Sequence, residues 1–375
     1  MDYINDINQT FENKHVRAFR EAGGKVVGFT CVFTPVELLD AAGVMPYRIK
    51  ALGHPETDLA DGRLSRFNCR FCRSCLQLGL DGTYDFLDGI LESNGCDQLR
   101  GMYENWEYAS APGFFHYLKA PHQLHPDALD HYALELARLR TALEQHFGVT
   151  ITDDRLRDSM VRHRRIRAKL VALDRLREQE RPAMTGSEAL QVVLAGGAVP
   201  ASVYEELLDR LAADLAHRHV DRPRVRLLLG GAATDEPALF EAIEDVGATV
   251  VADTFCFGAR SYGPLLCETK GAGDLLRTLA EIYLGGSRCP RMFDEFDGRL
   301  AFVTEAVAEA RADGVILVNN KFCDLHGFDN VLLRMRLEEQ GVPVLALEKE
   351  YGSPADHGRM RTRVQAFLER IGGGR

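Results

Sequence analysis

Short apolar runs alternate with amphipathic, helix-like segments in the first third of the chain, and this alternation limits the possible fold more than any single motif. Lys25–Thr30 is rich in β-branched residues, and Pro35 opens a helix over Val36–Ala42 that Gly43 ends. Strands of a parallel sheet are buried on both faces and have nearly continuous apolar sequences, with helices between them. The pattern therefore predicts an α/β domain. Its further strand candidates are Tyr47–Leu52, Phe86–Glu92 and Phe115–Leu118.

The last third of the chain repeats this alternation. Helical stretches such as EPALFEAIEDVG and NVLLRMRLEEQG separate its apolar runs, and a predicted helix over Arg359–Ile371 follows the last of them. We predict a second α/β domain, so that the chain contains two doubly wound parallel sheets of the Rossmann or flavodoxin type. The strand candidates of this part are Arg224–Leu229, Ala248–Ala252, Gly314–Asn319 and Val342–Leu347.

The segment between these two parts has the sequence of a helical module. Leu, Ala, Arg and Glu dominate it, and apolar residues recur at three- and four-residue intervals, as in amphipathic helices. Its runs of charge are most simply the solvated faces of those helices. We therefore predict an N-terminal α/β domain over residues 1–125, a helical module over 126–222 and a C-terminal α/β domain over 223–375.

Composition limits the binding partners and the cellular location that we expect for the chain. A net charge of −10 argues against binding to nucleic acid or to an anionic membrane, because both need a basic surface. The nine cysteines do not form the dense framework of a secreted disulfide protein, so we expect reduced thiols and a cytoplasmic location. The polar N-terminus resembles no signal peptide, and we expect no membrane span.

Cysteines are the residues most suggestive of chemistry. Cys69, Cys72 and Cys75 follow one another at two-residue gaps, and Cys96 comes shortly after them. Thiolate sulfur is a soft ligand, and repeated Cys-x-x-Cys spacing is typical of iron–sulfur clusters and zinc sites. The alternative is that Cys72 and Cys75 are small apolar residues packed in the first turns of a helix, because free cysteine is often buried.

Most cysteines lie where open α/β sheets bind ligands. Cys31, Cys69 and Cys96 fall in or near loops beside predicted strands of the first α/β part, and ligands of such folds bind beyond the carboxyl ends of the strands. The second α/β part places three more in comparable positions, namely Cys256, Cys289 and Cys323.

Two other features permit both a chemical and a structural interpretation. Asp324 and His326, in the segment KFCDLHG, could donate protons or could be hydrogen-bonded structural residues. The Gly230-Gly231 pair could offer backbone amides to a phosphate or could simply form a turn. We expect no nucleotide site, because the chain has no Gly-x-x-x-x-Gly-Lys-Ser/Thr loop.

Several pieces of the sequence carry a family resemblance. From about Val26 to Leu368 the chain resembles the 2-hydroxyacyl-CoA dehydratase and benzoyl-CoA reductase family. The YDFLDGI piece, with Trp106 after the Cys96-Asp97 pair, is more similar to the benzoyl-CoA reductase type. The pieces that carry the resemblance are GFTCVFTPVELLDAAGVMPYRI, RFNCRFCRSCLQLGLDGTYDFLDGI, NGCDQLRGMYENW, DTFCFGARSY and NNKFCDLHGFDNVLLRMRLEEQGVPVLALEKE.

The resemblance implies an iron–sulfur cluster between the two α/β domains, held by cysteines of both. The best matches to the family's ligands are Cys31, Cys69 and Cys323. Six cysteines could hold two linked cubanes, so the alternatives are a single 4Fe–4S cluster and a double-cubane cluster. Further family-like positions are Cys96, Cys256 and Cys289, whereas Cys72, Cys75 and Cys267 depart from the family pattern.

The resemblance also implies an activity. Family members receive one electron from a separate ATP-hydrolysing iron–sulfur activator and pass it to an acyl-CoA thioester, which is either dehydrated or reduced in its aromatic ring. They work as pairs of related subunits, and Glu37 and His326 are the candidates here for moving protons. The resemblance therefore implies the iron–sulfur subunit of a benzoyl-CoA reductase-like enzyme that reduces or dehydrates an acyl-CoA. The alternatives are a 2-hydroxyacyl-CoA dehydratase subunit, a partner subunit that only relays electrons, and a double-cubane reductase of small molecules without CoA.

Overall fold

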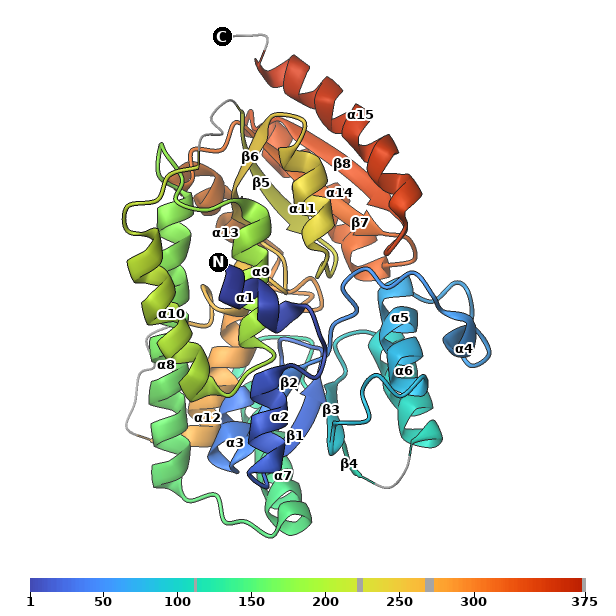
Figure 1. Ribbon diagram of the computed structural model, residues 1–375, viewed down its shortest axis with the longest axis vertical. Coiled ribbons are helices and arrows are strands. Elements are labelled where there is room, and N and C mark those ends of the chain that lie inside the picture. Colours follow the sequence, from blue (N-terminus) through green and yellow to red (C-terminus); the bar gives the residue numbers. More distant parts are fainter. Residues whose placement is uncertain (111–112, 221–224, 267–272, 373–375) are drawn as a thin grey trace.

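The computed structural model describes residues 1–110, 113–220, 225–266 and 273–372. It contains two four-stranded sheets in which every strand pair is parallel, with helices packed around both sheets (Figure 1). The predicted α/β fold with two doubly wound sheets is confirmed. The boundaries that we predict between domains stay predictions, and Arg224 and Cys267 lie outside the described residues.

The N-terminal sheet has the strand order β2-β1-β3-β4. The predicted second strand is displaced toward the N-terminus, because β2 already pairs with β1 from Val44 and ends at Arg48. The sheet accommodates Pro46 because β2 lies at its edge, where a residue without an N–H group does not interrupt the ladder. The strands are β1 (Lys25–Phe29), β2 (Val44–Arg48), β3 (Gly89–Ser93) and β4 (Phe114–Leu118).

The C-terminal sheet has the equivalent order, β6-β5-β7-β8. In each sheet the first and third strands in sequence lie side by side at the centre, and the chain leaves them toward opposite edges. The carboxyl ends of such a strand pair border a crevice, which is where open α/β sheets bind ligands. The strands are β5 (Val225–Gly231), β6 (Ala248–Asp253), β7 (Gly314–Asn320) and β8 (Val344–Lys349).

Helices connect the two halves of the molecule as well as covering each sheet. The predicted helical segment consists of four helices, and α8 contacts both α3 in the N-terminal half and β6 in the C-terminal half (Figure 1). Among its neighbours, α7 packs on β4, and α9 packs on α1 and α11. The four helices are α7 (Pro126–Phe147), α8 (Asp153–Arg177), α9 (Gly186–Gly196) and α10 (Ala201–Leu215).

Of the other helices, α1 and α2 precede the first strand, and the rest lie between or after the strands in sequence. The helix predicted after Pro35 is observed as α3, and the last predicted helix begins five residues earlier than expected, at Pro354. The N-terminal half contains α1 (Asp2–Asn8), α2 (Lys14–Glu21), α3 (Val36–Ala41), α4 (Asp58–Asp61), α5 (Arg70–Leu80) and α6 (Asp97–Ala109). The C-terminal half contains α11 (Pro237–Glu244), α12 (Leu275–Ala280), α13 (Phe296–Glu309), α14 (Asp324–Glu339) and α15 (Pro354–Gly372), with short turns of 3-10 helix at Ala259–Ser261 and of π-helix at Glu281–Gly285.

A buried carboxylate joins the two halves. Asp235, which follows β5, is fully buried and accepts hydrogen bonds from the backbone N–H groups of Ala51 and Leu52, at 2.6 and 3.0 Å, in the loop after β2. The Tyr351 hydroxyl donates to the same carboxylate at 2.5 Å and accepts from the N–H group of Gly53 at 2.9 Å. Asp235 therefore fixes the loop after β2 against the C-terminal sheet.

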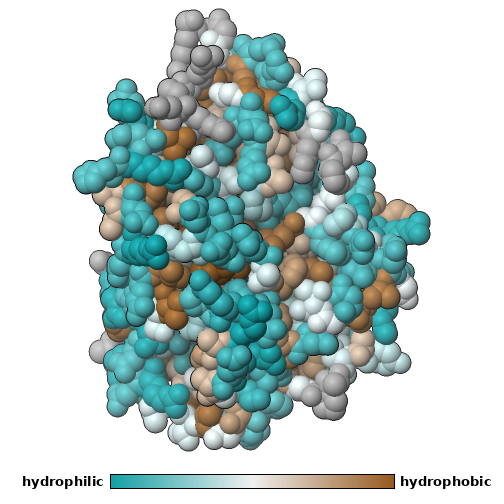
Figure 2. Space-filling view, viewed as in Figure 1, coloured by the Kyte–Doolittle hydropathy of each residue, from teal (hydrophilic) through white to brown (hydrophobic). Residues whose placement is uncertain are grey.

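The surface is largely hydrophilic, as the high content of charged residues leads one to expect. Hydrophilic residues predominate on the face shown in Figure 2, with hydrophobic residues in smaller patches between them. None of the helices in the described part of the chain is both long enough and apolar enough to cross a membrane.

We predict that replacing Asp235 destabilises the whole molecule. Asp235→Ala leaves three buried donors without an acceptor, and we expect it to lower the free energy of unfolding by about 3 kcal/mol. Urea unfolding followed by circular dichroism measures this change. Asp158→Ala, on the exposed side of α8, is the control and should change the free energy by less than about 0.5 kcal/mol. Equal effects of the two substitutions would show that the Asp235 contacts do not hold the halves together.

Candidate metal centre

A cavity of about 560 Å³ lies between the carboxyl ends of the two sheets. Its walls come from the segments after all four strands of the N-terminal sheet and after β5, β6 and β7 of the C-terminal sheet. The structure brings all six predicted ligand cysteines to this cavity, together with one that the family pattern does not include. The lining cysteines are Cys31, Cys69, Cys72, Cys96, Cys256, Cys289 and Cys323.

Three of these cysteines immediately precede helices. Cys69, Cys96 and Cys323 are the N-cap residues of α5, α6 and α14, respectively. The Leu99 N–H group donates to the Cys96 sulfur at 3.4 Å, and the three thiols interact electrostatically with one another. Helix N-termini carry partial positive charge and unpaired N–H groups, which stabilise anionic ligands. We call Cys69, Cys96 and Cys323 the N-cap set.

The other three predicted cysteines lie beside buried arginines. Arg260 interacts with both Cys256 and Cys289, and Arg291 interacts with Cys289 and Cys31. Both side chains are buried, and within the described residues neither guanidinium group is in ion-pair contact with a carboxylate, although Asp329 interacts with Arg260 electrostatically. We call Cys31, Cys256 and Cys289 the arginine set.

Backbone carbonyls hold Arg291 in place. Its guanidinium group donates to the carbonyl oxygen of Asn94 at 2.6 Å and also to those of Ala120 and Pro121. It also lies 4.9 Å from the centre of the Phe33 ring. Because these partners are neutral, the positive charge of Arg291 stays available to the thiols beside it.

Burial controls the protonation of these thiols. It raises the pKa of Cys31 to about 12, with further contributions from the charges of Glu92 and Cys289, and it raises the pKa of Cys323 to about 12. In contrast, a hydrogen bond from the Cys72 thiol lowers the pKa of Cys69 to about 7. Metal ligation requires thiolates, so binding of a metal or cluster here would release protons.

The donors fit a cluster better than a single ion. Nowhere in the described ranges do three His, Cys, Asp or Glu side chains converge on a point that could hold one metal ion. The thiols are instead distributed around a cavity wide enough for a larger group. Soft sulfur donors select zinc, copper(I) and iron–sulfur clusters, and an iron–sulfur cluster is the member of this group that spans several separated thiolates.

The two predicted proton-moving residues lie in different places. His326 lines the cavity and is buried, and its Nδ1 atom has no hydrogen-bond partner among the described residues. Burial, together with the nearby Arg260, lowers the pKa of His326 well below its usual value. Glu37 does not line the cavity. It forms an ion pair of 2.7 Å with Arg167 and accepts a hydrogen bond of 2.6 Å from Tyr283.

The cysteine triplet is divided between two environments. Cys72 lines the cavity and is hydrogen-bonded to Cys69, whereas Cys75, one turn later on α5, is fully buried in the hydrophobic core. The packing alternative therefore describes Cys75, while Cys72 takes part in the cavity wall.

Sequence reasoning missed three charged groups beside the thiols. Arg260 and Arg291 follow Cys256 and Cys289 by four and two residues, so a search for basic residues near the cysteines would have found them. Glu92, the next-to-last residue of β3, is fully buried, and burial raises its pKa to about 7. The strand pattern did not indicate that this carboxyl group is buried beside the Cys31 thiol.

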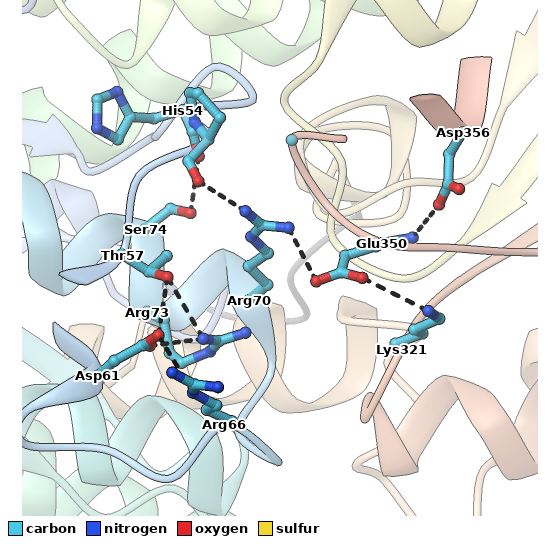
Figure 3. Close-up of polar contacts among 12 residues, drawn as sticks. His54, Thr57, Asp61, Arg66, Arg70, Arg73, Ser74, Lys321, Glu350 and Asp356 are labelled. Atoms are coloured by element: carbon cyan, nitrogen blue, oxygen red, sulfur yellow. Dashed lines mark hydrogen bonds and ion pairs between the residues drawn. The ribbon is translucent and has the colours of Figure 1, made fainter. Parts of the chain in front are cut away.

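A polar network closes the junction beside the N-cap set. Arg70, next to Cys69, donates to Glu350 at 2.8 Å, and Lys321, two residues before Cys323, forms an ion pair with the same carboxylate at 3.4 Å (Figure 3). These contacts connect α5 of the N-terminal half with the segments after β7 and β8. They hold two cysteines of the N-cap set, one from each half, at the same end of the cavity.

The fold and the site together define an α/β protein with two parallel sheets and a thiol-lined cavity between them. Residues 31–371 match the family model described as 2-hydroxyglutaryl-CoA dehydratase, D-component, and the chain belongs to this family.

Individual relatives agree with this assignment along nearly the whole chain. YjiM of Escherichia coli (strain K12), which is named provisionally as a dehydratase subunit, is 29% identical over 95% of this chain and 94% of its own length. A benzoyl-CoA reductase subunit from Thauera aromatica is 28% identical over 88% of both chains. The β subunit of (R)-2-hydroxyglutaryl-CoA dehydratase from Acidaminococcus fermentans is 24% identical over 94% of both. The predicted family is confirmed.

We predict that Gly95 is needed to make room for Cys31. A Cβ atom on Gly95 would lie 2.6 Å from the Cys31 sulfur and 3.2 Å from a Leu99 methyl group. Gly95→Ala should therefore lower the free energy of unfolding by about 1–3 kcal/mol, measured by anaerobic urea unfolding. Gly101→Ala in α6, where the nearest atom is 3.5 Å away, should be neutral or slightly stabilising. A neutral result for both would contradict the close packing of Cys31.

Proposed function

We propose that this chain is the cluster-holding subunit of a low-potential reductase or dehydratase that acts on a CoA thioester. The observation that carries the proposal is the meeting of six cysteines, from both α/β parts, at one buried cavity. The family and the names of the relatives, which include a benzoyl-CoA reductase subunit, support this activity. A separate ATP-dependent activator would supply electrons, and a related subunit would complete the enzyme in a reducing, cytoplasmic setting.

The N-cap set is the proposed ligand set of the cluster, and in it Cys96 replaces Cys31 of the set predicted from the resemblance. Cys69, Cys96 and Cys323 come from both halves of the molecule, and each has a helix N-terminus behind it. Three helix dipoles would stabilise the negative charge of thiolates and cluster, with an effect of about 0.3–1 kcal/mol each. When bound, a 4Fe–4S cluster supplies one-electron transfer at low potential.

The remainder of the cavity would receive the substrate. Its mouth is polar and exposed, with Arg100, Lys119 and His122 around it, and basic groups there suit the phosphates of CoA. Deeper in the cavity, Arg260 would stabilise negative charge on the acyl group, because a buried cation without a carboxylate partner attracts an oxyanion strongly. His326 is the proposed proton-moving residue, and a structural role is proposed for Glu37, because its carboxylate forms a buried ion pair with Arg167.

A specific observation favours a second candidate, the double-cubane reductase of small molecules. The arginine set, Cys31, Cys256 and Cys289, forms a second group of three thiols on the same cavity. The two sets meet where Cys96 interacts with Cys31 and where Cys323 interacts with Cys256. Two linked cubanes would use all six thiols and would leave little room for a CoA thioester.

Iron content distinguishes the two candidates. After anaerobic reconstitution, we expect about four irons per chain for the acyl-CoA enzyme and about eight for the double-cubane enzyme. Reduction of a panel of CoA thioesters in the presence of activator and ATP tests the substrate class. Absence of iron under all reconstitution conditions would refute both candidates.

We predict that single cysteine variants identify the ligands. Cys69→Ala, Cys96→Ala and Cys323→Ala should each remove most of the iron, measured by metal analysis and visible absorbance, because each removes one of three thiolates. Cys256→Ala and Cys289→Ala should keep four irons if there is one cluster and lose about half of eight if there are two.

Cys75→Ala is the matched control for these variants. It removes a buried thiol from the same helix as Cys72, at a position that does not line the cavity, and it should keep the wild-type iron content. If the N-cap variants keep as much iron as the Cys75 variant, the proposed ligand set is wrong.

A further inference from the structure

One cysteine of the cavity wall belongs to neither the N-cap set nor the arginine set. Cys72 lies on α5, three residues after Cys69, and it borders the cavity with an exposed fraction of 2%. The spacing of the two cysteines suggested metal ligation, yet the family pattern includes Cys69 and not Cys72. The cavity therefore contains a seventh thiol for which the proposed cluster provides no role.

Cys69 and Cys72 are arranged at the start of α5 as in redox-active dithiols. Cys69 is the N-cap residue, and its carbonyl oxygen accepts a hydrogen bond of 3.1 Å from the N–H group of Arg73. Cys72 is the third residue of the helix. A Cys-x-x-Cys pair at a helix N-terminus in a β-α-β unit is typical of thioredoxin-like dithiols, and α5 lies between the parallel strands β2 and β3.

The positions of the two residues permit a disulfide bond. The Cys72 thiol donates a hydrogen bond to the Cys69 sulfur, whereas Cys96 and Cys323 interact with Cys69 electrostatically. Residues three apart on a helix have Cα atoms about 5 Å apart, and disulfides span roughly 4.4–6.8 Å between Cα atoms. The side chain of Gln98 accepts a hydrogen bond of 3.1 Å from the Cys69 N–H group, which fixes the backbone at this position.

The third cysteine of the triplet is a poor disulfide partner for Cys72. Cys72 and Cys75 both occupy regular helical positions, where Cβ atoms three residues apart are about 5–6 Å from each other, and a disulfide needs roughly 3.5–4.5 Å. Cys75 is also fully buried in the hydrophobic core, away from the cavity. The backbone of Cys69, with a ψ angle of 123°, is not helical, so its Cβ atom is not held at the helical spacing.

A small polar oxidant can reach both thiols through the cavity. Cys69 and Cys72 line the same cavity of about 560 Å³ as Arg100 and Lys119, whose side chains are exposed at its mouth. Hydrogen peroxide is small and forms hydrogen bonds as water does. It can therefore enter through this polar mouth.

We propose that Cys69 and Cys72 are an oxidation site for peroxides, at which the two thiols close into a disulfide when no cluster occupies the cavity. First, the Cys69 sulfur attacks one oxygen of hydrogen peroxide, the O–O bond breaks, and a sulfenic acid and one water form. The Cys72 sulfur then attacks the sulfenic sulfur, an S–S bond forms, and the hydroxyl group leaves with the Cys72 proton as a second water. In total, two thiols are oxidised to one disulfide and one peroxide is reduced to two waters.

The disulfide would preserve Cys69 for renewed use as a ligand. A sulfenic acid without a neighbouring thiol is oxidised further to a sulfinic acid, which dithiols do not reduce, whereas thiol–disulfide exchange restores both thiols of a disulfide. The inference rests on the proposed function only for the meaning of Cys69 as a cluster ligand, because the reaction of the two thiols does not require a cluster.

Peptide mapping of the full chain tests the proposal. Iron is removed anaerobically with a chelator, the thiols are reduced, a small excess of hydrogen peroxide is added, and the remaining thiols are alkylated in denaturant. Trypsin then cleaves after Arg70, between the two cysteines, which leaves Cys69 in peptide 67–70 and Cys72 in peptide 71–73. We expect mass spectrometry to find these two peptides joined in most molecules and dithiothreitol to separate them.

Two variants distinguish dithiol chemistry from simple packing of Cys72. In Cys72→Ser, the Cys69 peptide should gain two oxygen atoms as a sulfinic acid, and dithiothreitol should not restore its thiol. This variant should bind as much iron as the wild type when it has not met peroxide, and less than about half as much when reconstituted after peroxide and dithiothreitol. Cys75→Ala is the matched control on the same helix, and it should form the Cys69–Cys72 disulfide in the yield of the wild type.

The outcomes separate this inference from the proposed function. Wild-type protein in which Cys69 and Cys72 stay unlinked, or in which Cys72 links to Cys75 instead, would overturn the inference, as would full recovery of the Cys69 thiol in Cys72→Ser. Circular dichroism shows whether this variant folds, and if it does not, the peptide map of the wild type decides alone. If the disulfide forms but no preparation binds iron, the proposed function fails and the oxidation site stands. Iron binding by a chain that forms no such disulfide has the opposite meaning.

Discussion

The Asp235 carboxylate is the constraint on which the relative position of the two halves depends. A buried carboxylate is stable only when hydrogen bonds replace its lost water, and here the backbone amides of Ala51 and Leu52 and the hydroxyl of Tyr351 do so. The amides belong to the loop after the edge strand of the N-terminal sheet, and Asp235 follows the central strand of the other. The carboxyl ends of both sheets consequently face one cavity, so that cysteines distant in sequence become neighbours.

Charge balance explains how so many thiols share that cavity. Each thiol that loses its proton to a metal or cluster would need compensation for its negative charge, and the two ends of the cavity supply it differently. Helix N-termini behind Cys69, Cys96 and Cys323 supply partial charges of about +0.5 each, whereas full guanidinium charges lie beside Cys256 and Cys289. The carboxylates of Asp97 and Asp324, directly after Cys96 and Cys323, add negative charge to the cavity lining. Glu92, close to Cys31, has its pKa raised by burial to about 7, which limits the negative charge that it adds.

The sequence predicted the fold well because strands buried on both faces have an apolar pattern that depends on local sequence alone. The displaced boundary of β2 shows the limit, since Pro46 is acceptable only at a sheet edge and edge position is a tertiary property. The cysteines could be placed at one site because strand ends of parallel sheets converge. In contrast, the partners of Glu37 could not be predicted, because Arg167 and Tyr283 come from distant segments that meet only in the folded chain.

The two surfaces that reach the cavity differ in chemistry. Around the mouth, Arg100, Lys119 and His122 are exposed and hydrated, so water and charged molecules can enter there at little desolvation cost. At the N-cap end, apolar side chains surround the groove to Cys323, and leaving them in water costs about 25 cal/mol per Å². Burial of the apolar groove at Cys323 would therefore be favourable, whereas the polar mouth loses no free energy by remaining exposed to water. The proposed substrate, which is charged, would therefore enter at lower desolvation cost through the polar mouth than through the apolar groove.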